Sequence, residues 1–161
     1  MKQVLININE KLVSNFPETT ITKGKEKRPL ISHKNLECSD IRQVFNKNIE
    51  KYNEGSTWGF LLGDDLMCLD FDSDDVYNKW KEKFPELETC PLEKTKKGYH
   101  CFFENDYHYT SKTNIEKNVD LLAIENSGTR RYVVIAPSPD KEWINDFVQT
   151  DVQSMSSGLK T

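Results

Sequence analysis

The most distinctive hydrophobic pattern of this chain lies in residues 66–72, where a run of apolar residues leads directly into two carboxylates. Residues 66–69 are continuously apolar, which is typical of a buried strand. Side chains alternate between the two faces of a strand, so Asp70 and Asp72 are expected on one face at the strand's end. The pattern therefore predicts a buried strand that ends in a pair of neighbouring carboxylates.

Two segments have the three- and four-residue apolar spacing of an amphipathic helix. We predict one helix over residues 40–52, with Ser39 as its N-cap. We predict a second helix that Ser73 caps and Pro85 stops. The first of these helices is expected to be core scaffold rather than part of a site.

Shorter apolar or alternating runs predict the remaining strands. These runs are residues 58–62, 92–95, 99–103, 119–124 and 132–136, with a weaker candidate at 4–8. Residues 63–65 are predicted to be the turn of a hairpin that joins strand 58–62 to strand 66–72. Residues 105–117 are predicted as an exposed loop, and Trp143 to Phe147 as a short amphipathic helix.

The order of these elements, paired strands around a helix followed by more paired strands, predicts an α+β fold in which helices flank the sheet. A chain of 161 residues is expected to form one domain. We assign that domain to residues 1–150 and expect residues 151–161, which contain three Ser, to be a mobile C-terminal tail.

The composition limits the class of protein. Hydrophobic residues make up 36% of the chain and include eight Phe, six Tyr and three Trp, which is enough apolar area to exclude disorder throughout. The formal net charge of -4 provides no global basic field and argues against a passive nucleic-acid coat. It is compatible with an enzyme whose acidic site is surrounded by local clusters of basic residues.

The cysteines and the apolar runs indicate a soluble, intracellular protein. Four cysteines occur without any C-x-x-C spacing, so a zinc finger is not predicted and the thiols are expected to be reduced. No apolar run approaches the ~20 residues of a membrane helix, so no membrane association is expected.

Most of the acidic residues near the central strand have a local structural explanation, but Asp70 and Asp72 do not. Acids in the predicted turn and in the first turn of the helix after Ser73 are expected there for structural reasons. Two ionised carboxylates held close together repel each other unless a cation lies between them or one is protonated. A divalent, oxygen-binding metal such as Mg²⁺ or Mn²⁺ is the simplest such cation.

Two further strands carry candidate site residues. Asp120 is a single carboxylate in the otherwise apolar strand 119–124, where a lone charge is costly unless it is paired or bound to metal. His100 follows the basic turn Lys96-Lys97-Gly98, and an imidazole beside a cationic turn could hold a triphosphate. A hydrogen-bonded structural role for His100 remains the alternative.

A basic segment near the N-terminus is a candidate phosphate contact. Lys25, Lys27 and Arg28 lie in a loop that Gly24 and Pro29 punctuate. Flexible cations of this kind suit a polyanion, although a solvated loop would have the same composition.

Four motifs together resemble the archaeo-eukaryotic primase superfamily, and in particular its bifunctional DNA primase/polymerase branch from viruses, phages and plasmids. They are Asp70-Phe71-Asp72, Lys97-Gly98-Tyr99-His100, Val119-Asp120-Leu121-Leu122 and Tyr132-Val133-Val134-Ile135-Ala136-Pro137-Ser138. The resemblance is strongest over residues 23–139. It implies a primase-polymerase catalytic core with an antiparallel or mixed, RRM-like sheet and flanking helices.

The resemblance also implies roles for individual residues. Asp70, Asp72 and Asp120 would bind two Mg²⁺ or Mn²⁺ ions, and His100 would contact the phosphates of the incoming nucleotide, helped by Arg130 or Arg131. Lys27 and Arg28 resemble a basic feature found early in such domains. Lys97 is a departure, because it stands where many relatives have Ser.

The activity that the resemblance implies is two-metal transfer of a nucleotide from an NTP or dNTP to a 3′-hydroxyl on a single-stranded DNA template in replication. A replicative helicase, fused or separate, is an expected partner, and a virus, phage or plasmid an expected source. The chain is expected to be a minimal catalytic core or an excised domain.

Other readings of the same residues remain open. A degenerate primase-like domain would bind nucleic acid without catalysis. An RRM-like binding module would display aromatics such as Tyr99, Phe102 and Phe103 to bases. A nucleotide-sugar glycosyltransferase would also use Asp-x-Asp with Mn²⁺, but it explains neither His100 nor Asp120.

Overall fold

The computed structural model describes residues 1–31 and 36–160 of the chain. Its helices are α1 (Lys2–Asn15), α2 (Cys38–Glu50), α3 (Asp74–Lys83), α4 (Glu86–Thr89) and α5 (Ser157–Lys160). Its strands are β1 (Thr20–Lys25), β2 (Arg28–Pro29), β3 (Thr57–Leu62), β4 (Leu66–Phe71), β5 (Leu92–Lys94), β6 (Tyr99–Glu104), β7 (Lys112–Glu116), β8 (Val119–Leu122), β9 (Arg131–Ile135) and β10 (Glu142–Asn145).

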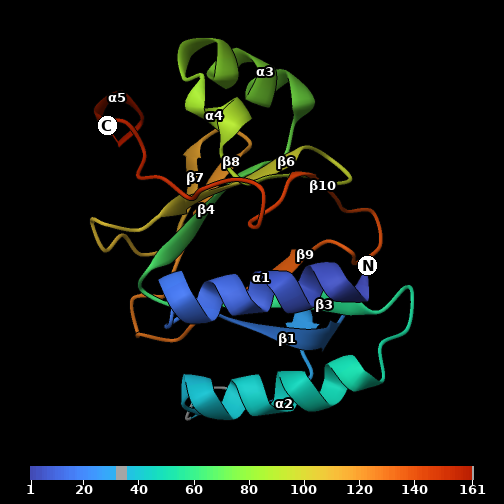
Figure 1. Cartoon of the computed structure of the whole chain (residues 1–161). Helices are drawn as coiled ribbons and strands as arrows, with labels where there is room; N and C mark the ends of the chain where they lie inside the picture. The colour runs from blue at the N-terminus through green and yellow to red at the C-terminus, as the bar shows by residue number, and fades with distance from the viewer. Residues whose placement is uncertain (32–35, 161) are drawn as a thin grey trace.

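The strands form two antiparallel sheets, which we call sheet A and sheet B. Sheet A has the order β2-β1-β3-β9, and sheet B has the order β10-β5-β6-β4-β8-β7. In Figure 1, α3 and α4 lie over sheet B at the top of the view, while α1 and α2 lie beside sheet A at the bottom. The predicted α+β class, with antiparallel strands and flanking helices, is confirmed.

The predicted hairpin between β3 and β4 is wrong, because the two strands belong to different sheets. β3 pairs with β1 and β9, and β4 pairs with β6 and β8, so both strands are already paired on both edges. The intervening turn is bound to the start of β1 instead. Asp65 accepts hydrogen bonds from the Glu18 amide at 2.9 Å and the Thr19 hydroxyl at 2.7 Å, and the Gly63 amide donates to the same hydroxyl at 3.1 Å.

The weak first strand is also wrong, because residues 4–8 lie in α1. Leu5, Ile8 and Leu12 are completely buried, and their three- and four-residue spacing places them on one face of the helix. A window of five apolar residues is too short to distinguish this helical spacing from a strand.

Two segments of sheet B were predicted as something other than strands. The predicted loop 105–117 contains β7, an edge strand whose five side chains are all exposed. Because neither face of β7 is buried, its sequence does not alternate between apolar and polar residues. The predicted helix around Trp143 is β10, which pairs with β5. Trp143 still packs on the core, with its ring 5.8 Å from that of Phe102.

The two predicted helices are present with small changes at their ends. α2 begins at Cys38 after the N-cap Glu37, so Ser39 is not the cap that we predicted. α3 is capped as predicted, because the Ser73 hydroxyl accepts a hydrogen bond from the Val76 amide at 3.3 Å. It ends at Lys83, two residues before Pro85.

Sheet B separates two hydrophobic cores. Met67, Leu69 and Phe71 point from one face of β4 into the core beneath α3 and α4. Leu66 and Cys68 point from the other face into a core that is shared with sheet A. The even-numbered face of β4 is thus the face that meets sheet A, and Asp70 belongs to that face.

The C-terminal residues contact the rest of the domain. The Glu104 amide donates to the Gln153 carbonyl at 2.9 Å, Met155 is buried, and the Ser156 hydroxyl donates to Glu86 at 2.9 Å. The mobility of the tail stays a prediction. No helix within the described residues is long and apolar enough to span a membrane.

Candidate active site

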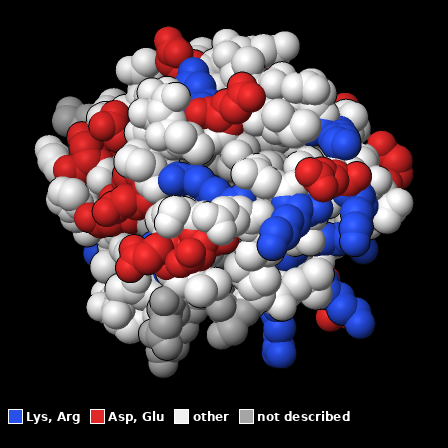
Figure 2. Space-filling model, turned by 60° about the horizontal axis from the view of Figure 1, so that its bottom comes forward, with Lys and Arg blue, Asp and Glu red and all other residues white. Residues whose placement is uncertain are grey.

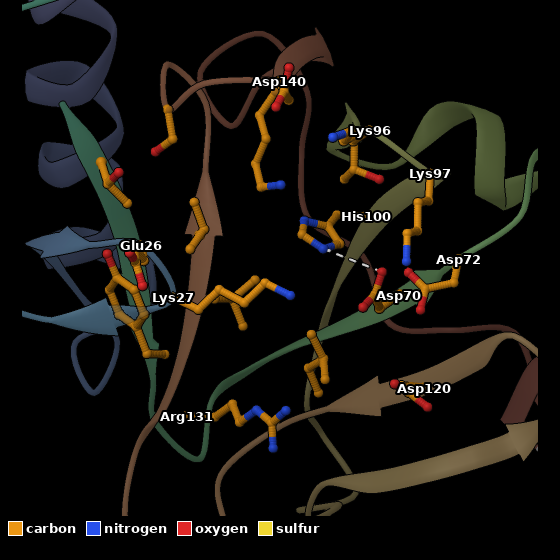
Figure 3. Close-up of a pocket in the computed structure, with 18 of the residues that line it drawn as sticks. Glu26, Lys27, Asp70, Asp72, Lys96, Lys97, His100, Asp120, Arg131 and Asp140 are labelled. Atoms are coloured by element: carbon orange, nitrogen blue, oxygen red, sulfur yellow. Dashed lines mark ion pairs between the residues drawn. The ribbon is translucent and has the colours of Figure 1, made fainter. Parts of the chain in front are cut away.

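A cleft of about 980 Å³ opens between the two sheets. Its walls include Asp70, His100 and Asp120 from sheet B, and Thr57 and Tyr132 from sheet A. The cleft lies beyond the point where the shared apolar core ends, on the face of β4 that meets sheet A. In Figure 3, Lys27 and Arg131 extend into this space from one side, and His100 and Asp70 lie on the other.

The candidate residues of sheet B form a row across neighbouring strands. Asp70 on β4 lies directly opposite His100 on β6 and Asp120 on β8. Asp72 lies two residues further along the chain, on the same side as Asp70, and it also lines the cleft. The structure therefore brings together the four residues that were expected from the sequence to be catalytic, Asp70, Asp72, His100 and Asp120.

His100 is held between two carboxylates. Its Nδ1 lies 2.7 Å from Oε1 of Glu93, and its Nε2 lies 3.4 Å from Oδ1 of Asp70, the contact drawn as a dashed line in Figure 3. Burial would lower the pKa of the imidazole, but the hydrogen bonds and negative charges of Asp70 and Glu93 raise it to about 9. At neutral pH the cleft therefore contains an imidazolium beside Asp70.

The carboxylates are close in the sheet but do not form a closed metal cage. Asp70 and Asp120 are directly opposite like charges, an arrangement that destabilises a sheet. One oxygen of Asp120 accepts a hydrogen bond from the Asn114 amide at 2.7 Å. Within residues 1–31 and 36–160, no three Asp, Glu, His or Cys side chains converge as a group that could hold a metal ion.

This donor set still suits the ions predicted from the sequence. Mg²⁺ is usually held in proteins by one or two carboxylates, with substrate phosphates and water as the remaining ligands. Asp70, Asp72 and Asp120 supply hard oxygen donors in one cleft, and the repulsion between Asp70 and Asp120 would be relieved by a cation. The residues present therefore fit a divalent metal that is completed by substrate.

Cationic side chains surround the acidic row. They are Lys27, Lys96, Lys97, Arg130, Arg131 and Lys141. In Figure 3, Lys97 extends toward Asp72, and Lys27 extends into the cleft from the opposite wall. On the outer surface, Figure 2 shows most of the Lys and Arg of the face in view on its right side, with some Asp and Glu among them, and mostly Asp and Glu on its left side. The net charge of -4 thus conceals local basic regions.

The two predicted arginines have different surroundings. Arg130 donates to the carbonyls of Glu18, at 3.3 Å, and Leu36, at 3.2 Å, so it connects the start of β9 to the segments before β1 and before α2. Arg131 is ion-paired with Glu125 at 3.0 Å and is directed into the cleft in Figure 3. Arg28 lies in β2 but is not among the residues that line the cleft, in contrast to its neighbour Lys27.

Two motif residues have structural reasons for their identity. A Cβ atom on Gly98 would lie 1.8 Å from the Phe71 carbonyl oxygen, so only glycine lets the start of β6 approach the end of β4 this closely. The Ser138 hydroxyl accepts from the Trp58 amide at 2.8 Å and donates to the Trp58 carbonyl at 2.9 Å. Ser138 therefore completes the backbone hydrogen bonding at the start of β3.

Residues 12–155 match the family model of the bifunctional DNA primase/polymerase, N-terminal domain. This chain belongs to that family. The match covers the cleft and both sheets, and it extends beyond residues 23–139, where the sequence resemblance is strongest. A search of curated proteins found no matching sequence.

The structure of this primase/polymerase domain does not support the display of aromatics to bases. Phe102 and Phe103 are buried in the two cores, and the Tyr99 ring stacks on Tyr77 with centroids 4.0 Å apart. These rings stabilise the domain and are not arranged as a stacking platform for single-stranded nucleic acid.

Glu93 and Lys141 are parts of the site that the sequence reasoning missed. Glu93 is completely buried and contacts His100, and Lys141 lines the cleft. No clear signal in the sequence marks Glu93, because in the short strand Leu92–Lys94 it stands beside a second charged residue, Lys94, and not alone in an apolar run as Asp120 does. Lys141 lies in a polar segment that has no comparable pattern.

Proposed function

We propose that this domain is a DNA-directed primase or polymerase that transfers nucleotides from NTPs or dNTPs to a 3′-hydroxyl on a single-stranded DNA template. Membership of the bifunctional primase/polymerase family supports DNA and nucleotides as the substrates. The observation that carries the proposal is the row in which Asp70 lies directly between His100 and Asp120 in a cleft lined by cations.

In this proposal Asp70, Asp72 and Asp120 hold two divalent ions together with the substrate phosphates. Bound Mg²⁺ or Mn²⁺ would activate the attacking hydroxyl and stabilise the leaving pyrophosphate. By holding these ions, the three carboxylates would place the 3′-hydroxyl and the α-phosphate next to each other, which would remove much of the entropic cost of bringing them together. The cleft itself is wide enough to hold a nucleotide against these groups.

His100 and the basic side chains bind the triphosphate. The imidazolium of His100 can donate a charge-assisted hydrogen bond to a phosphate oxygen, because its Nε2 faces Asp70 in the cleft at the relatively long distance of 3.4 Å. Lys96 and Lys97 approach from the turn before β6, and Arg131 from the opposite wall. Their charges offset the negative charge that develops on the pyrophosphate.

The test is primer synthesis and primer extension on a single-stranded DNA template, with NTPs or dNTPs and with Mg²⁺ or Mn²⁺. The double variant Asp70→Asn, Asp72→Asn removes two charges without changing side-chain size. We expect it to lose at least about a hundredfold in rate, the scale of removing a group that stabilises transition-state charge. The matched control is Asp74→Asn, Asp75→Asn, which removes two exposed carboxylates from the first turn of α3 and should keep the wild-type rate.

Two results would contradict the proposal. Equal activity of the wild type and the Asp70→Asn, Asp72→Asn variant would place the chemistry elsewhere. A folded wild type without activity under all these conditions would support a domain that only binds nucleic acid or nucleotides. Titrations with nucleotide and with Mn²⁺ would then identify which of the two it binds.

A further inference from the structure

A buried glutamate lies behind His100, outside all the motifs that identify the family resemblance. Glu93 on β5 is directly opposite His100 on β6, and its side chain is completely buried. One carboxylate oxygen lies 2.7 Å from Nδ1 of His100. The other accepts a hydrogen bond at 2.5 Å from the Ala136 amide, which follows the last residue of β9.

The two oxygens of the Glu93 carboxylate set the direction of both hydrogen bonds. A peptide amide can only donate, so one Glu93 oxygen must accept from Ala136. The second oxygen can only accept as well, so Nδ1 of His100 must carry a proton. This proton fixes the imidazole with Nδ1 directed to Glu93 and Nε2 directed to Asp70 and the cleft.

The same side chain connects the two walls of the cleft. His100 belongs to sheet B, whereas Ala136 extends β9 of sheet A. Residues 131–134 of β9 line the cleft opposite His100. A buried charge that accepts hydrogen bonds from both sheets therefore holds the phosphate-facing imidazole at a defined position relative to the opposite wall.

We propose that Glu93 is a positioning residue that holds His100 in the orientation needed to bind the triphosphate of the incoming nucleotide. The proposal rests on the function proposed above. Glu93 does not touch the substrate in this arrangement. It acts through His100, as a carboxylate behind a histidine fixes the tautomer and ring orientation in metal sites.

The test uses Glu93→Gln, which keeps the size of the side chain but replaces one acceptor oxygen with a donor amide. If the Gln oxygen accepts from Ala136, the Gln nitrogen can only donate, so it can meet His100 only at an unprotonated Nδ1, and a protonated Nδ1 loses its acceptor. We expect the KM for nucleotide to rise about tenfold with a smaller change in kcat, the lower end of the range for such supporting residues. The matched control is Glu142→Gln, an exposed residue on the neighbouring strand β10.

A double-mutant cycle with His100→Gln separates positioning from general damage. If Glu93 acts through His100, Glu93→Gln should cost little further nucleotide affinity in a chain that already carries His100→Gln. Equal losses in both backgrounds, or a fall in kcat and in DNA affinity that matches the rise in KM, would overturn the proposal and indicate a purely structural role.

A measurement on the wild type keeps the proposal testable if Glu93→Gln does not fold. Proton and nitrogen NMR of the histidine side chains should show a protonated Nδ1 on His100, with the signal identified by its absence from His100→Gln. An unprotonated Nδ1 would overturn the proposal. Affinity for dTTP, measured without turnover, distinguishes the two proposals. If the wild type is inactive but Glu93→Gln still weakens dTTP binding, the proposed nucleotidyl transfer is contradicted and the positioning role of Glu93 is not.

Discussion

The same face of sheet B serves two different purposes at its two ends. At one end Leu66, Cys68 and Phe102 pack against sheet A in the shared hydrophobic core. At the other end Asp70 and His100 line the open cleft. The change occurs within single strands, between residues 68 and 70 of β4 and between residues 102 and 100 of β6. The apolar end thus fixes the spacing of the sheets, and the polar end uses that spacing for chemistry.

Replacing the ring that joins the two sheets should have the largest effect on stability. Phe60 of sheet A is completely buried, and its ring centroid lies 5.4 Å from that of Phe102 in sheet B. We expect Phe60→Ala to lower the free energy of unfolding by about 3–5 kcal/mol, measured by denaturant titration. Val13→Ala, at a half-exposed position of α1, is the control and should change it by less than about 0.5 kcal/mol. A loss below about 1 kcal/mol for Phe60→Ala would mean that the sheets are held together elsewhere.

The contrast between the two ends explains why the sequence could single out the candidate residues of the cleft more readily than it could predict how the strands are paired. Asp70, Asp72 and Asp120 are charged residues in or beside apolar runs, and His100 lies two residues after the glycine of a basic turn. These are local signals that one strand carries by itself. The alternation of side chains along β4 was enough to place Asp70 and Asp72 on one face.

The parts that could not be predicted depend on contacts distant in sequence. A turn such as residues 63–65 looks the same whether it closes a hairpin or carries the chain to another sheet, and only its bonds to Glu18 and Thr19 distinguish the two. β7 was missed because an exposed edge strand has no buried side. The role of Glu93 required knowing that β5, β6 and β9 converge.

The stability of the domain should depend on pH through His100, which lies at the polar end of this face. Its folded-state pKa is raised to about 9 from an ordinary value of 6.5, so the folded state binds the proton more tightly than the unfolded chain. The stability from the imidazolium is fully present below pH 6.5 and is lost as the pH rises through about 9. The charged groups in contact with the ring are Asp70 and Glu93.

Thermal unfolding in buffer with EDTA measures this effect. We expect the wild-type melting temperature to fall more steeply from pH 6.5 to about 9 than that of His100→Gln. His108→Gln is the matched control, because His108 also contacts a carboxylate, Asp64 at 2.6 Å, but on the exposed surface where such pairs contribute little. Parallel curves for the wild type and His100→Gln would show that this imidazole does not stabilise the fold through its charge.

The smallest expected effect is that of Asp120→Asn on the free energy of unfolding, and its sign should depend on whether Mn²⁺ is present. Asp70 and Asp120 are like charges at directly opposite positions of two paired strands, so Asp120→Asn should raise the free energy of unfolding by about 0.2–1 kcal/mol in EDTA. The asparagine oxygen can still accept from the Asn114 amide, so this backbone contact is kept. With Mn²⁺ present the order should reverse, because the wild type gains stability from the bound ion and the variant binds it less well. Denaturant titrations with and without Mn²⁺ measure the difference in free energy of unfolding between the variant and the wild type under both conditions. If the variant is less stable than the wild type even in EDTA, Asp120 stabilises the fold, as the apolar residues at the other end of this face do. The interpretation of Asp120 as a carboxylate that destabilises the sheet until a cation binds would then be wrong.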